Sequence, residues 1–304
     1  MSLDFTRDEC ARIGVMKTRF LRVTTGDKLI LQGLLYEPDK STNRIILHIH
    51  GMAGNFYENR FLDSMAEVFT KNGWGFLSVN TRGHDHIADF PISGAKEQNK
   101  RTGNFREKFE ECVLDIGAWM DFIDKAGYKN ITLQGHSLGS VKAVYFLAKT
   151  GDKRVSKLVL ASPPDMVGLA EAEKDHNDLL KLSKKMISKG RGEEMLPKLL
   201  WNSYYLSANT YVDFGERGNP IDVFNTHSKD RSSVLEKIKV PTLAFLGSKD
   251  DAAILPVKQA LEVIKKKAKN CPRFDTLVVE GAPHSYFGHE KEVAEMIDDW
   301  LTKN

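Results

Sequence analysis

Apolar runs of strand length alternate along most of this chain with stretches in which apolar residues recur at helical spacing. The strand-like runs cover residues 17–25, 28–36, 43–50, 74–80, 130–134, 157–161, 241–246 and 274–280. Helical spacing covers residues 56–72, 105–125, 137–149, 256–267 and 291–301. The first two strands meet at Gly26-Asp27, a hairpin turn signal, whereas helices separate most of the others. The chain is therefore predicted to be an α/β protein with a doubly wound, mostly parallel sheet and one antiparallel edge.

The alternation stops between residues 164 and 235. That segment carries helical patterns over 179–187 and 194–205 but no clear pair of strands. The sequence therefore predicts a core domain made of residues 1–163 and 236–304, with residues 164–235 inserted into it as a helical cap.

Composition and charge narrow the range of partners. Hydrophobic residues make up 41% of the chain and charged residues 28%, both ordinary for a globular protein, and the net charge is only +3. The densest basic run, residues 265–269, closes a predicted helix, where cations complement the helix dipole. We therefore expect no nucleic-acid partner, while the oligomeric state stays open.

Cysteine usage and hydropathy bear on the compartment. Cys10, Cys112 and Cys271 are few and far apart, which predicts neither a disulfide framework nor a metal motif. Residues 1–14 contain no apolar targeting segment, and no run of about 18 apolar residues occurs. We therefore expect a cytoplasmic protein with no membrane span.

The strongest chemical motif is Gly135-His136-Ser137-Leu138-Gly139, which follows an apolar strand and opens a helix. This is the context of a nucleophile elbow, in which a sharp turn between small residues presents a serine Oγ above the sheet. The backbone N–H of Leu138 then lies at a helix N-terminus, where it can bind an oxyanion. The alternative is a glycine-rich turn with an ordinary serine at the start of a helix.

A second glycine-rich loop, residues 50–54 (HGMAG), follows the third strand. Stabilising an oxyanion takes a second N–H donor beside the elbow, and Met52 is the first choice for it, with Ala53 next. His50 is a candidate to line the substrate pocket. The alternative is a plain strand-to-helix turn.

The acid that orients the base is expected after the next-to-last strand, where the chain reads Gly247-Ser248-Lys249-Asp250-Asp251. Asp250 is preferred, the adjacent Asp251 stays open, and Asp165 is a weaker third choice. Each of these aspartates could instead be a turn or helix-capping residue.

The base is expected after the last strand, where His284 follows the small residues of Gly281-Ala282-Pro283. His289 is a weaker alternative, because a surface histidine is the common case. The order Ser137, Asp250, His284 is one of the known orders of a serine catalytic triad.

Together these motifs resemble the α/β-hydrolase superfamily over nearly the whole chain outside the cap, and Asn80-Thr81-Arg82-Gly83-His84 is similar to a turn found in many members. A narrower resemblance rests on HIHGMAGNFYENRF, SYYLSANTYVDF and NPIDVFNTH, which are similar to a group that includes fungal siderophore esterases. That resemblance implies hydrolysis of an ester in a hydroxamate-type or other polar metabolite.

The expected function is hydrolysis of a carboxylic ester of a small molecule through a Ser-His-Asp triad and an acyl-enzyme, with no cofactor and no metal. A metal at His84-Asp85-His86 is disfavoured, because adjacent ligands with no third partner make a poor site. Thioesterase, lactonase, amidase, acyltransferase and carbon–carbon hydrolase stay open on the same residues. A non-catalytic ligand-binding protein is the alternative of another class.

Aromatic residues of the cap are candidates for the wall of the acyl pocket: Trp201, Tyr204, Tyr205, Tyr211 and Phe214. They could equally pack the cap onto the sheet. A lipase is disfavoured, since we find no interfacial amphipathic helix with a strongly basic face.

Overall fold

The computed structural model describes residues 16–95, 98–228 and 234–304. The N-terminal stretch 1–14 and Cys10, on which two of the expectations above rest, lie outside the described residues. Within the described part, no helix combines the length and the apolar character that crossing a membrane requires.

One eight-stranded sheet forms the centre of the protein, in the order β1-β2-β4-β3-β7-β8-β9-β10. Its strands are β1 (Lys17–Thr24), β2 (Ile30–Glu37), β3 (Arg44–Ile49), β4 (Gly75–Val79), β7 (Asn130–His136), β8 (Val155–Ala161), β9 (Thr242–Gly247) and β10 (Phe274–Val279). β1 pairs with β2, and β2 with β4, in antiparallel fashion. In the rest of this sheet, from β4 across to β10 in the order given, all neighbouring strands are parallel. The predicted fold class is therefore confirmed.

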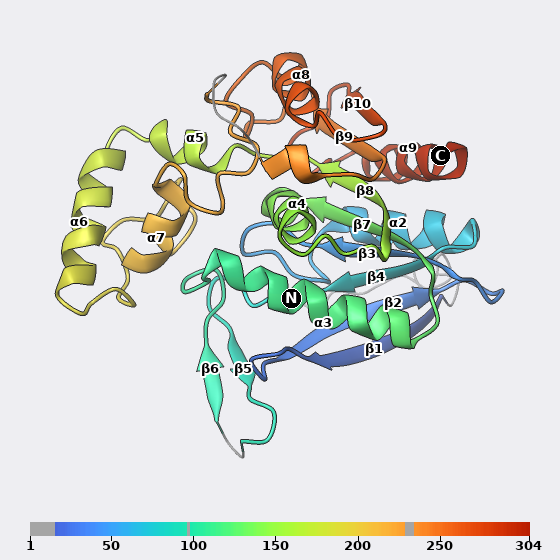
Figure 1. Ribbon diagram of the computed structural model, residues 1–304, viewed down its shortest axis with the longest axis horizontal. Coiled ribbons are helices and arrows are strands. Elements are labelled where there is room, and N and C mark those ends of the chain that lie inside the picture. The colour runs from blue at the N-terminus through green and yellow to red at the C-terminus, as the bar shows by residue number, and fades with distance from the viewer. Residues whose placement is uncertain (1–15, 96–97, 229–233) are drawn as a thin grey trace, which may run out of the picture.

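Helices cover both faces of this sheet (Figure 1). α2 (Arg60–Lys71) and α9 (Glu290–Lys303) pack on one face, and α3 (Cys112–Lys125), α4 (Leu138–Thr150) and α8 (Val257–Lys267) on the other. Successive side chains of a strand point to opposite faces. Accordingly Ile45 and Leu47 belong to the core under α3 and α4, whereas Ile46 packs with the residues of α2 and α9. Because both faces are buried, the inner strands are nearly continuous apolar runs.

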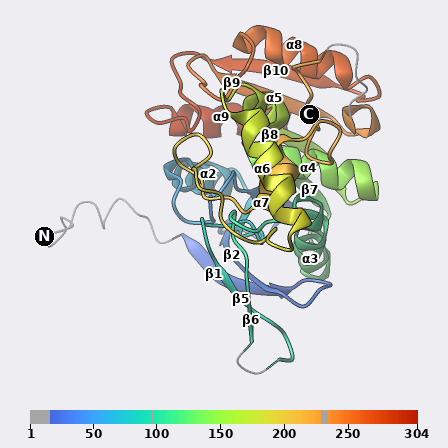
Figure 2. The same ribbon diagram turned by 90° about the vertical axis from the view of Figure 1, so that its left-hand side faces the viewer.

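Three helices lie between β8 and β9 along the chain: α5 (Met166–Glu171), α6 (His176–Ser188) and α7 (Ala208–Gly215). They form a group beside one end of the sheet, at the left of Figure 1 and in front in Figure 2. This is the segment for which the sequence predicts a cap. Two short 3₁₀ turns, Phe109–Glu111 and Val234–Lys237, precede α3 and β9.

The helix predicted over 194–205 is wrong. The backbone there forms isolated bridges, Met195 to Ser207 and Leu200 to Tyr204, and Trp201 has a positive φ of 51°. Pro197 accounts for this in part, because a proline inside a helix removes a hydrogen bond and clashes with the preceding turn. The patterns also gave no indication of the small hairpin β5 (Asp89–Pro91) and β6 (Asn99–Arg101), whose strands are too short for a periodicity to show.

The turn from β7 into α4 requires glycine for space. A Cβ on Gly139 would lie 2.1 Å from the carbonyl oxygen of Ile49, at the end of β3. A Cβ on Gly135 would lie 2.3 Å from the backbone of Gly139. Helix α4 therefore starts in direct backbone contact with the neighbouring strand, which fixes the height of Ser137 above the sheet.

Gly139→Ala should lower the free energy of unfolding by about 1–3 kcal/mol, the usual cost of overpacking, because the backbone of β3 has to move. Gly117→Ala is the matched control, since Gly117 lies inside α3 and a Cβ there would meet nothing within 4 Å. That change should stabilise the protein by up to about 1 kcal/mol through helix propensity. Urea unfolding of the two variants measures both effects, and equal stability of the two would contradict the close approach.

Candidate active site

Ser137 lies at the end of β7 and caps the N-terminus of α4 with φ 54° and ψ −125°. A positive φ is uncommon for a residue that carries a Cβ, and such strain collects at functional sites. The main-chain N–H of Ser137 donates to the carbonyl of Ala161 in the neighbouring strand (2.9 Å), which holds the turn in place. Ser137 thus lies in a tight turn between strand and helix, at the position where the sequence predicts an elbow.

His284 and Asp250 come together from the loops after β10 and β9. The Nδ1 of His284 lies 2.8 Å from Oδ1 of Asp250. Because a carboxylate can only accept, the ring carries its proton on Nδ1 and donates it to Asp250. The carboxylate is fully buried, whereas the imidazole is 23% exposed. The structure thus pairs the two residues that the sequence predicts as acid and base.

Two side chains donate hydrogen bonds to the backbone of His284. Its carbonyl oxygen accepts hydrogen bonds from Nε2 of His136 (3.0 Å) and from Oγ of Ser162 (3.2 Å). Burial, followed by the charge of His284, lowers the pKa of His136 to about 3, so the supporting ring stays neutral. The position of the exposed imidazole therefore rests on buried, uncharged donors.

The pKa of Asp250 reflects a competition. Burial by itself would raise this pKa, but the hydrogen bond and the positive charge that His284 offers outweigh it. A further hydrogen bond from the main-chain N–H of Ala252 acts in the same direction (3.0 Å). The net result is a pKa below the ordinary value, so Asp250 is an anion at neutral pH.

A pocket of about 350 Å³ opens above these residues. Its wall mixes polar and apolar side chains and contains both Ser137 and His284; the lining residues are Met52, Ser137, Pro164, Met166, Leu169, Trp201, Ser203, Tyr204, Asp251, Ala252 and His284. Trp201 and Tyr204 lie where the sequence analysis places them. Pro164, Met166 and Leu169 were missed, since apolar residues after β8 and in a short helix carry no signal that separates pocket from core.

Four other candidates for the pocket lie elsewhere. His50 is 1% exposed and directs both ring nitrogens into the protein, so its placement in the pocket is corrected. Tyr205 is 39% exposed, and its ring meets the edge of His86 (5.8 Å between centroids) outside the lining. Tyr211 and Phe214 are buried in the core, which is the packing alternative.

The loop predicted to supply a backbone donor lies directly against the serine. A Cβ on Gly51 would come within 3.0 Å of Cβ of Ser137. The main-chain N–H of Met52 has no acceptor among the described residues. Leu138 is the first residue of α4, where backbone N–H groups have no partner within the helix. The loop that carries the N–H of Met52 and the start of α4 thus both adjoin Ser137.

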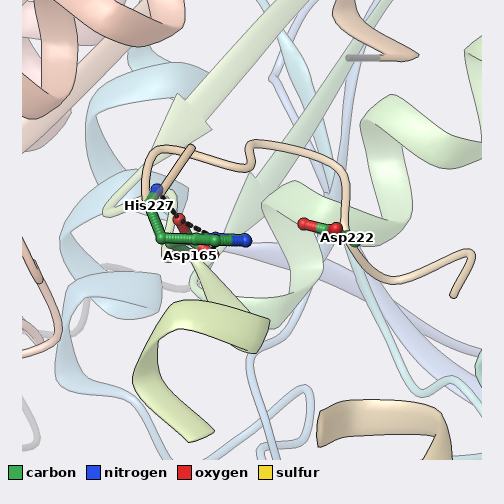
Figure 3. Close-up of side chains that lie close together, drawn as sticks. All are labelled: Asp165, Asp222 and His227. Atoms are coloured by element: carbon green, nitrogen blue, oxygen red, sulfur yellow. Dashed lines mark hydrogen bonds and ion pairs between the residues drawn. The ribbon is translucent and has the colours of Figure 1, made fainter. Parts of the chain in front are cut away.

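Asp165, the third choice for the acid, belongs to a separate cluster (Figure 3). Both of its carboxylate oxygens lie 2.9 Å from Nδ1 of His227, and Oδ1 also accepts from the N–H of Gly168. Asp165, Asp222 and His227 offer ligand atoms within 4.8 Å of one another and so could approach a metal ion. The ammonium of Lys267 binds the backbone carbonyl of Asn225 in the same loop, and its positive charge already acts on both aspartates. The structure therefore favours a hydrogen-bonded link that fixes the start of α5.

The remaining histidine candidates are also placed. His289 is bonded to Glu292 (2.8 Å), away from the pocket. His84 is bonded to Asp85 (3.0 Å) and packs edge-on against Phe90, and neither it nor His86 joins a group of possible metal ligands among the described residues. The other group of possible ligands is Asp250, Asp251 and His284.

Comparisons with known proteins identify the family and the fold. Residues 44–199 match the family model described as alpha/beta hydrolase fold. A phospholipase A1 of Vespa velutina is 25% identical over 154 residues, which make up 49% of this chain and 47% of that protein. The match therefore spans about half the length of the curated relative.

Solved structures resemble the chain over most of its length. Est1E of Butyrivibrio proteoclasticus, solved with ferulic acid bound, is 18% identical over 92% of this chain and 98% of that chain, with a TM-score of 0.63. An esterase of Pyrococcus furiosus is 18% identical, with coverages of 100% and 96% and a TM-score of 0.65. The α/β hydrolase GrgF of Penicillium sp. is 17% identical, with coverages of 95% and 99% and a TM-score of 0.69. At these identities the likeness shows the fold.

Because the contact with His284 outweighs burial, we expect the pKa of Asp250 to lie below the ordinary value of 3.8. Because the folded-state pKa is depressed, the stability that the ionised group contributes is present above pH 3.8 and is lost as the pH falls through the lower folded value. Titration of the Asp250 carboxyl carbon by NMR measures the midpoint. A value above 3.8 would show that burial outweighs the contact with His284.

Proposed function

Because this chain belongs to the α/β-hydrolase family, we propose that it is a serine hydrolase that cleaves a carboxylic ester of a small molecule. One observation carries the proposal: Ser137, held at a positive φ, and His284, paired with the buried Asp250, line the same pocket. A serine is a weak nucleophile by itself and needs an adjacent base, which in turn needs an orienting group. All three roles have a side chain here.

In the proposed reaction, Ser137 Oγ attacks the acyl carbonyl while Nε2 of His284 takes the hydroxyl proton. Asp250 holds the ring in the tautomer that leaves Nε2 unprotonated, and it stabilises the imidazolium that forms. The imidazolium then gives the proton to the leaving alkoxide, which departs as the alcohol. Water, deprotonated by His284, releases the acid and restores Ser137.

The negative charge of the tetrahedral intermediate needs donors that are in place before the reaction. We assign this role to the N–H groups of Met52, which lines the same pocket as Ser137, and of Leu138, which follows Ser137 at the start of α4. Removing one such donor costs on the order of 3 kcal/mol in the barrier, so the position of this loop matters for turnover.

The pocket favours a compact, partly aromatic acyl group. A volume of about 350 Å³ is near the lower end of the range for ligand sites, roughly 300–1,000 Å³. Trp201 and Tyr204 offer ring faces and edges, and Asp251 is the carboxylate on the wall. A long lipid acyl chain, as the name of the Vespa velutina relative suggests for that protein, is the rival substrate.

Hydrolysis of p-nitrophenyl esters from acetate to decanoate by the wild type and by Ser137→Ala tests the proposal. We expect turnover that depends on Ser137 and declines for the longest chains, because the pocket is small. Turnover that rises steadily with chain length would favour the lipid substrate. Absence of both ester turnover and reaction with a fluorophosphonate at Ser137 would favour the alternative of a ligand-binding protein.

The pair Asp250 and Asp251 provides a matched comparison for the acid. Asp250→Asn removes the carboxylate that fixes His284 and should lower kcat by about 10³–10⁴-fold. Asp251→Asn changes a residue of the pocket wall and should lower kcat less than about 10-fold, a cost typical of one peripheral contact. Steady-state kinetics on one ester would reveal the reverse ranking if Asp251 were the acid.

A further inference from the structure

A chain of polar side chains runs beneath the loop 50–54 and uses no group that touches the pocket. Nζ of Lys142, in α4, lies 2.6 Å from Oε1 of Glu107 and 3.1 Å from Oγ1 of Thr81. Oγ1 of Thr81 lies 3.0 Å from Nε2 of His50, and Nδ1 of His50 lies 2.7 Å from the carbonyl oxygen of Gly51. These four side chains belong to residues that are at most 1% exposed.

Two obligatory donors fix the direction of the hydrogen bonds in this chain: the ammonium of Lys142 and the main-chain N–H of Thr81. An ammonium only donates, so the hydroxyl oxygen of Thr81 accepts from Lys142 and its single hydrogen is left for His50. The main-chain N–H of Thr81 also donates to Nε2 of His50 (3.0 Å). Nε2 is therefore unprotonated, and the ring donates its one proton from Nδ1 to the carbonyl of Gly51.

The imidazole of His50 stays neutral. Burial, followed by the charge of Lys142, holds its pKa well below the ordinary value of 6.5. A cationic ring would carry a proton on Nε2 and would repel the N–H of Thr81. The tautomer that serves Gly51 is thus the only one compatible with the partners on both sides.

The last bond of the chain orients a peptide plane. The carbonyl of Gly51 and the N–H of Met52 belong to one trans peptide, in which the two groups point in opposite directions. His50 and the main-chain N–H of Gly54 (3.1 Å) both donate to this carbonyl and so fix the direction in which it points. The N–H of Met52 therefore points away from His50 and Gly54, and a Cβ on Gly51, the residue before it, would lie 3.0 Å from Cβ of Ser137.

We propose that His50, Thr81 and Lys142 are positioning residues that aim the backbone N–H of Met52 at the oxyanion formed on Ser137. This rests on the proposed function. Lys142 lies about one turn after Leu138 in α4, so the same helix carries one donor and anchors the chain that aims the other. The charge of Lys142 also polarises the chain toward Gly51, which strengthens the N–H of Met52 as a donor.

Thr81→Val removes the hydroxyl between Lys142 and His50 and leaves no cavity, because the two side chains have nearly the same shape. We expect kcat to fall about 10-fold with KM unchanged, since the donor acts on the transition state and not on the bound ester. Thr81→Ser keeps the hydroxyl and should recover most of the loss. Thr132→Val is the matched control: Thr132 is also buried, and its hydroxyl has no partner among the described residues, so kcat should stay at the wild-type value.

His50→Leu removes the bond to Gly51 itself and should lower kcat by about 10²-fold, with the affinity for a trifluoromethyl ketone analogue falling in parallel. Thermal unfolding shows whether each variant is folded. A loss confined to KM, an equal loss in Thr132→Val, or an unchanged analogue affinity would overturn the positioning role. Lys142 is left unchanged, because its removal would leave Glu107 buried without its counter-charge.

Nitrogen NMR of His50 provides a readout that needs no activity. The proposal requires a protonated Nδ1 and an unprotonated Nε2 from pH 5 to 9 in the wild type. The opposite tautomer, or titration of the ring in that range, would refute the proposed series of hydrogen bonds even if the enzyme is active. If the tautomer is as described but Ser137→Ala hydrolyses esters as well as the wild type, the proposed function fails instead.

Discussion

The arrangement of the site depends on one close approach, between the start of α4 and the carboxyl end of β3. Gly139 passes so near the carbonyl oxygen of Ile49 that no side chain fits between them. This contact sets Ser137 at the rim of the sheet and places the loop after β3 beside it. The acid and the base come from the loops after β9 and β10, two strands that are fixed by pairing in the same sheet.

Two Asp–His pairs show how the same contact takes different roles in one protein. Asp250 and His284 meet at the wall of the pocket, where the imidazole is partly exposed. In the other pair, Asp165 accepts from the ring and the main-chain N–H of His227, and both side chains are buried. The chemistry of the two pairs is alike, and the difference is access. A pair that no substrate can reach contributes to the structure of α5 and the loop that follows α7.

Much of the fold could be predicted from the sequence, because periodicity reports burial and the buried strands are long enough to show it. The placement of Ser137, Asp250 and His284 followed from local motifs at strand ends. The helix predicted over 194–205 failed, since Pro197 and the left-handed Trp201 override an apolar spacing. His50 was misplaced for a different reason: a histidine next to a glycine-rich loop does not reveal which way its ring turns. That direction is set by Thr81 and Lys142, which lie far from it in the chain.

Glu107 belongs to a segment that also supports the inserted helices. The carbonyl of Phe105 accepts from the N–H of Ser207 and the hydroxyl of Thr210, at the first turn of α7. Residues 105–107 therefore contact the inserted helices through Phe105 and the polar side chains beneath the loop 50–54 through Glu107. Inserted helices taken from another protein would have to reproduce these hydrogen bonds to the carbonyl of Phe105. A change in the inserted helices would therefore reach both the pocket wall, through Trp201 and Tyr204, and the backbone next to Glu107.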